Sequence, residues 1–238
     1  MTDGQKNTAI ILAAGKGSRM GSRTPKQFMF FYGEPMVLRS LRVFNDSPAI
    51  DEIILVTDGD YIEYCRSLID KKQIGKVTAV VPGGRERYES VLRGLEACDK
   101  EACRFVFIHD SARPYLTWDI IERAYEAVKE HPACAVGVPA KDTIKIVDPE
   151  GFVTETPVRD RTWIIQTPQV FSYELLCRAY ERVGKSAEGF EGITDDAMIV
   201  ERSGLARVRL VRGSYANIKI TTPEDLPVGA CKEGVRLL

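Results

Sequence analysis

The sequence has few histidines, no paired cysteine spacing and no long apolar run. Its only histidines are His109 and His131, and its six cysteines are scattered without a CxxC pattern. A structural zinc site is therefore not expected. No apolar stretch approaches the roughly 20 residues that a membrane span needs, and residues 1–7 lack the apolar core of a signal peptide. We expect a soluble cytoplasmic enzyme whose cysteines are reduced thiols that fill core space.

An excess of charge of one sign is also missing. The chain contains 33 basic and 34 acidic residues, which gives a net charge of -1. Without a global positive field, neither nucleic acid nor an anionic membrane is an expected partner. Any polyanionic ligand must instead meet a local cluster of cations. The 238 residues, 44% of them hydrophobic, are enough for one sizeable core, so residues 1–238 are interpreted as a single domain.

Short β-branched runs alternate along the chain with longer segments of helical period. The expected strands are Thr8–Ala14, Glu52–Thr57, Val77–Val81, Arg104–His109 and Cys134–Val138. The expected helices are Pro35–Phe44, Tyr61–Asp70, Arg85–Cys98 and Trp118–Lys129. This alternation predicts an α/β fold with a mainly parallel sheet flanked by helices. Such sheets bind ligands beyond the carboxyl ends of their strands, so the residues after each strand form the candidate site.

The pattern changes after the fifth expected strand. Two extended segments, Asp142–Val147 and Phe152–Val158, flank a turn at Pro149-Glu150-Gly151, which predicts a β-hairpin arm at about residues 141–160. The arm either reaches a second subunit or folds onto its own domain. Beyond it we expect two helical stretches, a strand at Arg207–Val211, a further extended segment at Ile218–Ile220 and a last helix from about Thr222.

A glycine-rich segment, Leu12-Ala13-Ala14-Gly15-Lys16-Gly17-Ser18-Arg19-Met20-Gly21, follows the first expected strand. Its glycines let backbone N–H groups approach phosphate oxygens, although an ordinary strand-to-helix connection would have a similar composition. The neighbouring cations favour a phosphate loop, because Lys16, Arg19, Arg23 and Lys26 lie within eleven residues. Their combined charge is about what a triphosphate requires.

Two common nucleotide-binding patterns do not fit this segment. A P-loop needs four residues between its first glycine and a Gly-Lys-Ser/Thr, and that spacing is absent. In the GxGxxG dinucleotide fingerprint the third glycine would come one residue before Gly21, and the acidic residue about 20 positions further on is missing. A nicotinamide-dependent dehydrogenase is therefore not expected.

Two later segments carry further candidate residues. Gly83-Gly84, followed by Ser90, either brings the backbone close to a flat base or forms an ordinary turn before a helix. The segment His109–Pro114 contains Asp110, a candidate Mg²⁺ ligand, and Arg113, and an internal ion pair between these two is the alternative. His109 is interpreted as a buried, hydrogen-bonded strand residue because its neighbours are apolar.

The chain resembles the 2-C-methyl-D-erythritol 4-phosphate cytidylyltransferases of the non-mevalonate isoprenoid pathway over nearly its whole length. The shared motifs are the Leu12–Met20 loop, Pro25-Lys26-Gln27, Gly83-Gly84 with Ser90, His109–Pro114, Asp142-Thr143, Gln166-Thr167-Pro168-Gln169, Ile193-Thr194-Asp195-Asp196 and Asn217–Thr221. The resemblance implies a Rossmann-like nucleotidyltransferase fold and a homodimer joined by its arms. It also implies Mg²⁺-dependent transfer of CMP from CTP to a sugar-alcohol phosphate.

The resemblance further implies roles for individual residues. The implied catalytic residues are Arg19, Lys26, Arg159 and Lys219. Those implied to bind the nucleotide are Ala13, Ala14, Gly15, Gly17, Gly83, Gly84, Ser90 and Asp110. Those implied to bind the acceptor substrate are Asp110, Arg113, Thr143, Arg159, Thr167 and Thr194, with Thr143 and Arg159 donated by the other subunit. Asp110 is also the implied metal ligand.

One position departs from the family pattern. The usual Asp-Ala-Ala-Arg-Pro reads Asp110-Ser111-Ala112-Arg113-Pro114 here, and Asp-Ser also occurs in the ribitol-5-phosphate cytidylyltransferases. Ala13-Ala14 and Thr222-Pro223-Glu224-Asp225 favour the methylerythritol group. The alternatives are a ribitol-5-phosphate cytidylyltransferase and, from another class, a non-catalytic nucleotide-binding protein on the same scaffold. The retained cations argue against the second alternative.

Overall fold

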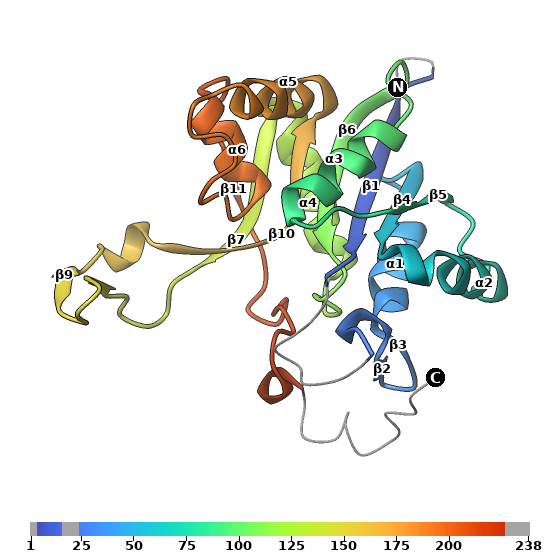
Figure 1. Cartoon of the computed structure of the whole chain (residues 1–238), viewed down its shortest axis with the longest axis horizontal. Coiled ribbons are helices and arrows are strands. Elements are labelled where there is room, and N and C mark those ends of the chain that lie inside the picture. The colour runs from blue at the N-terminus through green and yellow to red at the C-terminus, as the bar shows by residue number, and fades with distance from the viewer. Residues whose placement is uncertain (1–3, 16–23, 227–238) are drawn as a thin grey trace.

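A central sheet organises the computed structural model, which describes residues 4–15 and 24–226 (Figure 1). In these residues seven strands follow the order β11-β7-β10-β6-β1-β4-β5. They are β1 (Lys6–Ala13), β4 (Glu52–Thr57), β5 (Val77–Pro82), β6 (Cys103–Asp110), β7 (Ala133–Pro139), β10 (Trp163–Ser172) and β11 (Arg209–Arg212). Only β10 is antiparallel to its neighbours, β6 and β7. The expected mainly parallel α/β fold is confirmed.

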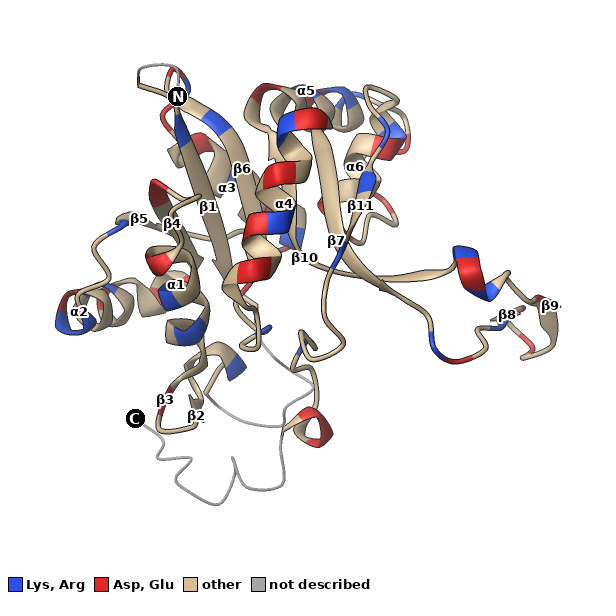
Figure 2. Ribbon diagram, turned by 180° about the vertical axis from the view of Figure 1, so that it is seen from behind, with Lys and Arg blue, Asp and Glu red and all other residues tan. Residues whose placement is uncertain are grey.

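Helices cover both faces of the sheet. They are α1 (Met36–Asp46), α2 (Ile62–Lys72), α3 (Arg87–Ala97), α4 (Trp118–Glu130), α5 (Tyr173–Gly184) and α6 (Asp196–Ser203). The helices α1, α2 and α4 pack on one face, and α3, α5 and α6 pack on the other. Along β1 the side chains alternate between these two cores, as the two-residue period of a strand requires. Figure 2 shows charges of both signs spread over the helices.

The two cores are tightly packed around β1. Ile10 and Ile11 are fully buried on opposite faces of the sheet. Burying each such side chain contributes about 1.5–3 kcal/mol. Gly94 lets α3 approach closely, since a Cβ there would lie 2.4 Å from Cγ2 of Ile10. A side chain at position 94 would therefore push α3 away from the sheet, and α3 begins at the ligand edge.

A hairpin leaves the sheet between β7 and β10. Its strands, β8 (Ile146–Val147) and β9 (Val153–Glu155), form a separate two-stranded sheet, and a one-turn 3-10 helix, η4 (Arg159–Arg161), follows. Figure 1 shows this arm projecting away from the layered body. The expected hairpin is confirmed, and it does not fold onto its own sheet. Phe152 is 69% exposed and Val158 is 64% exposed, so the arm presents apolar side chains to its surroundings.

Five short elements, three 3-10 helices and two two-residue strands, lie between or after the longer helices and strands. They are η2 (Lys26–Phe28), β2 (Phe30–Phe31), β3 (Glu34–Pro35), η3 (Gly59–Tyr61) and η5 (Pro223–Asp225). The extended segment expected at Ile218–Ile220 is not a strand; its Ile220 N–H instead donates to the Ala112 carbonyl at 2.8 Å. The helix expected from Thr222 is only the single turn η5 within the described residues. None of the helices described in residues 4–15 and 24–226 is long and apolar enough to cross a membrane.

Candidate active site

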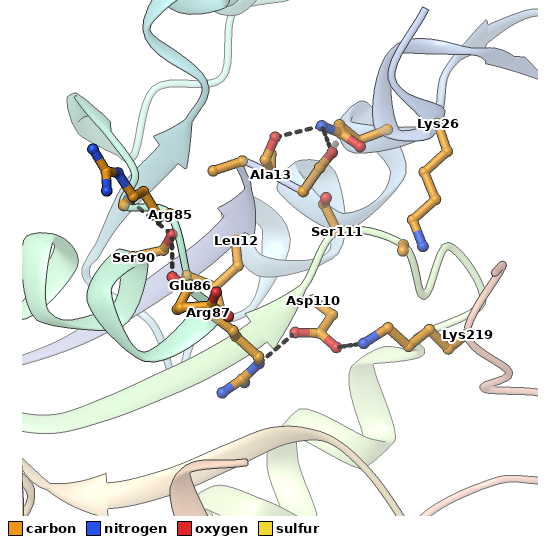
Figure 3. Close-up of a pocket in the computed structure, with 15 residues that line it drawn as sticks. Leu12, Ala13, Lys26, Arg85, Glu86, Arg87, Ser90, Asp110, Ser111 and Lys219 are labelled. Carbon is orange, nitrogen blue, oxygen red and sulfur yellow. Dashed lines mark hydrogen bonds and ion pairs between the residues drawn. The ribbon is translucent and has the colours of Figure 1, made fainter. Parts of the chain in front are cut away.

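A pocket lies at the carboxyl edge of the parallel strands (Figure 3). Its lining comes from the end of β1, the η2 turn, the start of α3, the end of β6 and the segment before η5. The lining residues that carry the argument are Ala13, Ala14, Gly15, Lys26, Gly84, Arg87, Ser90, Asp110 and Lys219. Most of the predicted nucleotide-binding residues are thus brought together. Gly17 and Arg19 lie outside the described residues.

Gln27 holds the point at which the glycine-rich loop leaves β1. Its side chain is buried, and its amide Nε2 donates to the Ala13 carbonyl at 2.6 Å and to the Gly15 carbonyl at 3.0 Å. The two carbonyls therefore turn toward Gln27. Its neighbour Lys26 extends along the pocket, where Nζ donates to the Ile220 carbonyl at 2.8 Å.

The Gly83-Gly84 turn packs too closely for side chains. A Cβ on Gly83 would lie 2.4 Å from Cβ of Ala14, and one on Gly84 would lie 2.2 Å from Cβ of Glu89. Ser90 fixes this turn, because its hydroxyl accepts from the Gly84 N–H at 3.1 Å and donates to the Glu86 carbonyl, just before α3, at 3.3 Å. The turn therefore lies close to Ala14, and the start of α3 that follows it lines the pocket.

Asp110 is the acidic centre of the pocket. Asp110 is only 8% exposed, and its carboxylate lies 2.7 Å from Lys219 Nζ and 3.3 Å from Arg87 Nε. Its backbone N–H donates to the Thr167 hydroxyl at 3.1 Å. Burial raises the pKa of the Asp110 carboxyl, but the charges of Arg87 and Lys219 outweigh it and hold the pKa well below its usual range. Asp110 is therefore an anion at neutral pH.

Arg113 does not pair with the Asp110 carboxylate. The two residues share a turn in which the Arg113 N–H donates to the Asp110 carbonyl at 3.0 Å. The Arg113 guanidinium instead donates to the Asn217 carbonyl at 2.8 Å and to the Ile165 carbonyl at 3.4 Å. The alternative of an internal ion pair is thus wrong. Arg113 thus ties the Lys219 segment to β10, and its role in binding the acceptor phosphate stays a prediction.

His109 has the buried structural role that its neighbours predict. Its side chain is fully buried, and Nδ1 lies 3.0 Å from the Thr167 hydroxyl. Burial lowers the pKa of His109 to about 3, so the imidazole is neutral at physiological pH. Thr167 is itself buried and contacts both His109 and the Asp110 backbone, which places it behind the pocket.

The other predicted substrate-binding residues lie away from this pocket. Thr143 and Arg159 are exposed on the arm, where Arg159 Nη2 donates to the Thr143 hydroxyl at 3.1 Å. Thr194 lines an adjacent pocket that shares Arg87 with the first. Within one chain, the structure therefore pairs the two arm residues with each other but does not bring them to Asp110.

Comparisons with known proteins identify the family. The family model for 2-C-methyl-D-erythritol 4-phosphate cytidylyltransferase, IspD, matches residues 7–231. The chain belongs to this family. Relatives of that name are 46% identical over 222 residues in Lachnospira eligens and 47% identical over 224 residues in Clostridium botulinum (strain 657 / Type Ba4). These matches cover 93% and 94% of this chain and 96% of each relative.

Solved structures of IspD proteins share the fold. The crystal structure of 4-diphosphocytidyl-2C-methyl-D-erythritol synthase from Anaerococcus prevotii matches with a TM-score of 0.81 at 33% identity, covering 94% of this chain and 95% of that one. The IspD structure from Francisella tularensis matches with a TM-score of 0.75 at 30% identity, covering 93% and 96%. The Rossmann-like nucleotidyltransferase sheet is therefore that of the IspD family.

The pocket of this IspD-family chain offers the Asp110 carboxylate to a metal ion. No group of three or more His, Cys, Asp or Glu side chains suited to a metal occurs in residues 4–15 and 24–226. Mg²⁺ is commonly held by one or two carboxylates together with substrate phosphates. Asp110 is ionised, lines the pocket and has oxygen lone pairs beyond its two ion pairs, so the donor set fits an ion that arrives with a nucleotide triphosphate.

Three residues at the site, of which Gln27 and Asn217 are buried, were not singled out from the sequence for the contacts they make. Arg87 bridges Asp110 and Asp196, Gln27 clamps the loop after β1, and Asn217 donates from Nδ2 to the Thr167 carbonyl at 2.9 Å. Arg87 stands three residues after Gly84, and that position was the available signal. Nothing near Asn217 in the sequence indicates a contact with a residue fifty positions earlier.

Proposed function

We propose that the protein transfers CMP from CTP to 2-C-methyl-D-erythritol 4-phosphate, giving 4-diphosphocytidyl-2-C-methyl-D-erythritol and pyrophosphate. The observation that carries this proposal is the family match over residues 7–231 together with a pocket that holds Asp110 between two cations. Residues 1–238 would act as a single nucleotidyltransferase domain, and the product would serve isoprenoid precursor synthesis by the non-mevalonate route.

The nucleotide would lie along the edge of the sheet between the loop after β1 and the start of α3. Gly83, Gly84 and Ser90 would face the cytosine base, while Ala13, Ala14, Gly15 and Gly17 would line the phosphates. Lys26, with Arg19 from outside the described residues, would hold the triphosphate. Lys219 lies 2.7 Å from Asp110 and would stabilise charge at the α-phosphate.

The reaction needs charge stabilisation more than proton transfer. The attacking phosphate monoester has a second pKa near ~6, so it is already ionised at neutral pH and requires no general base. One of its oxygens attacks the α-phosphorus of CTP, the bond to the β-phosphate oxygen breaks, and pyrophosphate leaves. Negative charge gathers on the bridging and leaving oxygens during this step. The neutral, buried His109 is consistent with a site that uses cations rather than a histidine base.

Mg²⁺ is the metal we propose, with Asp110 as its protein ligand. When bound with the nucleotide, the ion would neutralise triphosphate charge and polarise the α-phosphate. Lys219 and Lys26 would provide the remaining positive charge from the protein.

We also propose a homodimer in which the arm of one subunit completes the pocket of the other. Thr143 and Arg159 are exposed on the arm, away from their own pocket, and already form a polar pair. Exposed apolar residues such as Phe152 and Val158 supply contact surface for a second copy. The planar guanidinium of Arg159 suits the terminal phosphate of the acceptor.

We propose a cytoplasmic location. In the described part of the chain, Cys65, Cys98, Cys103, Cys134 and Cys177 are all free thiols, as is usual in a reducing compartment.

D-Ribitol 5-phosphate is the second candidate acceptor, and Ser111 is the residue that favours it. Ser111 is buried, lines the pocket and donates its N–H to the Leu12 carbonyl at 3.0 Å.

Pyrophosphate release should be measured with purified protein, CTP, Mg²⁺ and either acceptor, and with each component omitted. We expect release that requires CTP and 2-C-methyl-D-erythritol 4-phosphate together. No release with either acceptor would favour the non-catalytic alternative.

A further inference from the structure

Arg87 joins two carboxylates that belong to different parts of the fold. It is the first residue of α3, and its Nε lies 3.3 Å from Oδ1 of Asp110 while its Nη1 lies 2.8 Å from Oδ2 of Asp196. Figure 3 shows Arg87 and Lys219 approaching the Asp110 carboxylate from opposite sides. Each oxygen of Asp110 thus faces one cation.

The far end of this bridge is rigidly held. Asp196 is fully buried, and its Oδ1 accepts from the Tyr180 hydroxyl at 2.7 Å. The backbone N–H groups of Asp196 and Ala197 both donate to Oε1 of Gln169 at 3.0 Å. The backbone and Oδ1 of Asp196 are therefore held by hydrogen bonds, and its Oδ2 forms the ion pair with Arg87.

Arg87 is poorly placed to act as a phosphate ligand itself. Its planar fork is committed to the two carboxylates, and Nη2 is buried without a hydrogen-bond partner in the described residues. The strong attraction between a guanidinium and two carboxylates instead defines the angle at which Asp110 enters the pocket. A lysine has a single nitrogen and cannot span both carboxylates in this way.

We propose that Arg87 is a positioning residue for CMP transfer, which holds the Asp110 carboxylate in its working orientation and is itself anchored by Asp196. This role rests on the proposed function, because Asp110 must act on the nucleotide for its orientation to matter. Although Arg87 lines the pocket, it acts through Asp110 rather than on the substrate. The supporting pair, Asp196 and Tyr180, lies behind it in the core between α5 and α6.

The variants must separate positioning from folding. Arg87→Lys keeps the charge but removes the bridge. Arg87→Met combined with Asp196→Asn removes both charges, so that neither carboxylate nor guanidinium is left buried and unpaired. Tyr180→Phe removes only the hydroxyl that donates to Asp196. The matched control is Arg93→Lys, an exposed arginine on the same helix that pairs only with Glu96, at 3.0 Å.

Four quantities should be measured for each variant: kcat and KM in the pyrophosphate assay, CTP affinity by calorimetry with the acceptor omitted, and Tm. Supporting residues behind a metal or catalytic ligand typically contribute about 10–100-fold to activity, so we expect Arg87→Lys and the double variant to lower kcat by that factor. CTP affinity should fall in parallel, while KM for the acceptor changes less than about threefold. Tyr180→Phe should lower kcat by about fivefold, the effect of one hydrogen bond. Arg93→Lys should match the unmodified protein.

A double-mutant cycle gives the decisive comparison. If Arg87 acts through Asp110, adding Arg87→Lys to Asp110→Asn should lower kcat by less than about threefold further. Full multiplication of the two losses would overturn the proposal, as would a lower Tm with normal kcat. If the Arg87 variants fail to fold, normal kcat in Tyr180→Phe overturns it, and the expected loss there supports it. Pyrophosphate release by the unmodified protein tests the proposed function, whatever Arg87 does. Failure of the proposed function can therefore be distinguished from failure of the positioning role.

Discussion

Charged side chains of alternating sign line up at the base of the pocket. Asp196, Arg87, Asp110 and Lys219 form a row in which each carboxylate lies beside a cation. Only Lys219, whose side chain is 39% exposed, stands at the open end of this row. Arg87 lies between two carboxylates, whereas Lys219 pairs with Asp110 alone and is the more exposed of the two cations, so Lys219 is the better placed to meet an incoming phosphate.

Lys219→Ala should therefore lower turnover sharply. Removing one well-placed donor to developing negative charge typically costs on the order of 10²–10³ in kcat, and we expect a loss of that size here, as also for Lys26→Ala and Arg19→Ala. Lys129→Ala, which removes an exposed lysine on α4, is the control. A Lys219→Ala protein with near-normal kcat would remove this residue from the mechanism.

The buried His109 makes stability depend on pH. Its folded pKa is lowered to about 3 from an ordinary value of 6.5, so the unfolded state binds a proton first as the pH falls. Above pH 6.5 His109 is neutral in both the folded and the unfolded state, so its burial makes no pH-dependent contribution to stability there. Below that pH the free energy of unfolding should decrease, by at most about 1.4 kcal/mol per pH unit. Urea unfolding between pH 7.5 and about pH 5.5, where carboxylates remain largely ionised, measures this. A flat profile in that window would show that His109 titrates normally.

Two elements, the strand β10 and the arm, determine which side chains lie at the pocket. The antiparallel strand β10 enters the sheet between β6 and β7 and places Thr167 behind Asp110. The arm, in contrast, carries Thr143 and Arg159 away from the central sheet of its own chain (Figure 1). One chain alone therefore presents a pocket for the nucleotide and, separately, a polar pair suited to a phosphate.

Mixing two impaired variants, at an acceptor concentration too low to saturate the Arg159→Ala protein, tests whether the arm works on a second subunit. Arg159→Ala should raise KM for the acceptor, and Lys219→Ala should lower kcat. In a heterodimer of the two, one site would combine an intact pocket with an intact arm. Co-refolding equal amounts should then restore about a quarter of normal activity, because half of the dimers carry one working site of two. No recovery in a mixture shown to contain heterodimers would mean that the arm acts within its own chain.

Across the whole molecule, the sequence predicted the parallel strands and their helices within a few residues. Buried β-branched runs such as Glu52–Thr57 are easily recognised in the sequence, because a strand buried on both faces is apolar along most of its length. The strand β10 was not anticipated as a central strand, since Gln166-Thr167-Pro168-Gln169 interrupts its apolar pattern and proline is rarely found in such a strand. Ile218–Ile220 looked extended, but its hydrogen bonds go to the β6 loop and to Lys26.

Part of the site was also predictable. Glycines and charged residues after strands located the pocket, because the carboxyl ends of parallel strands meet at one edge. The contacts of Arg113 and Arg87 were not predictable, since they depend on which carbonyls and carboxylates three separate elements bring within reach. The roles of Gly17 and Arg19 remain predictions, because both lie outside the described residues.

A competition between the two acceptors tests the central claim most directly. The protein would be given CTP, Mg²⁺ and equal concentrations of 2-C-methyl-D-erythritol 4-phosphate and D-ribitol 5-phosphate, and the two products would be separated by mass. Their initial ratio equals the ratio of the two kcat/KM values. We predict that 4-diphosphocytidyl-2-C-methyl-D-erythritol exceeds CDP-ribitol by at least about tenfold, which corresponds to roughly 1.4 kcal/mol of discrimination. An excess of CDP-ribitol would contradict the proposed substrate while leaving the cytidylyl transfer chemistry in place.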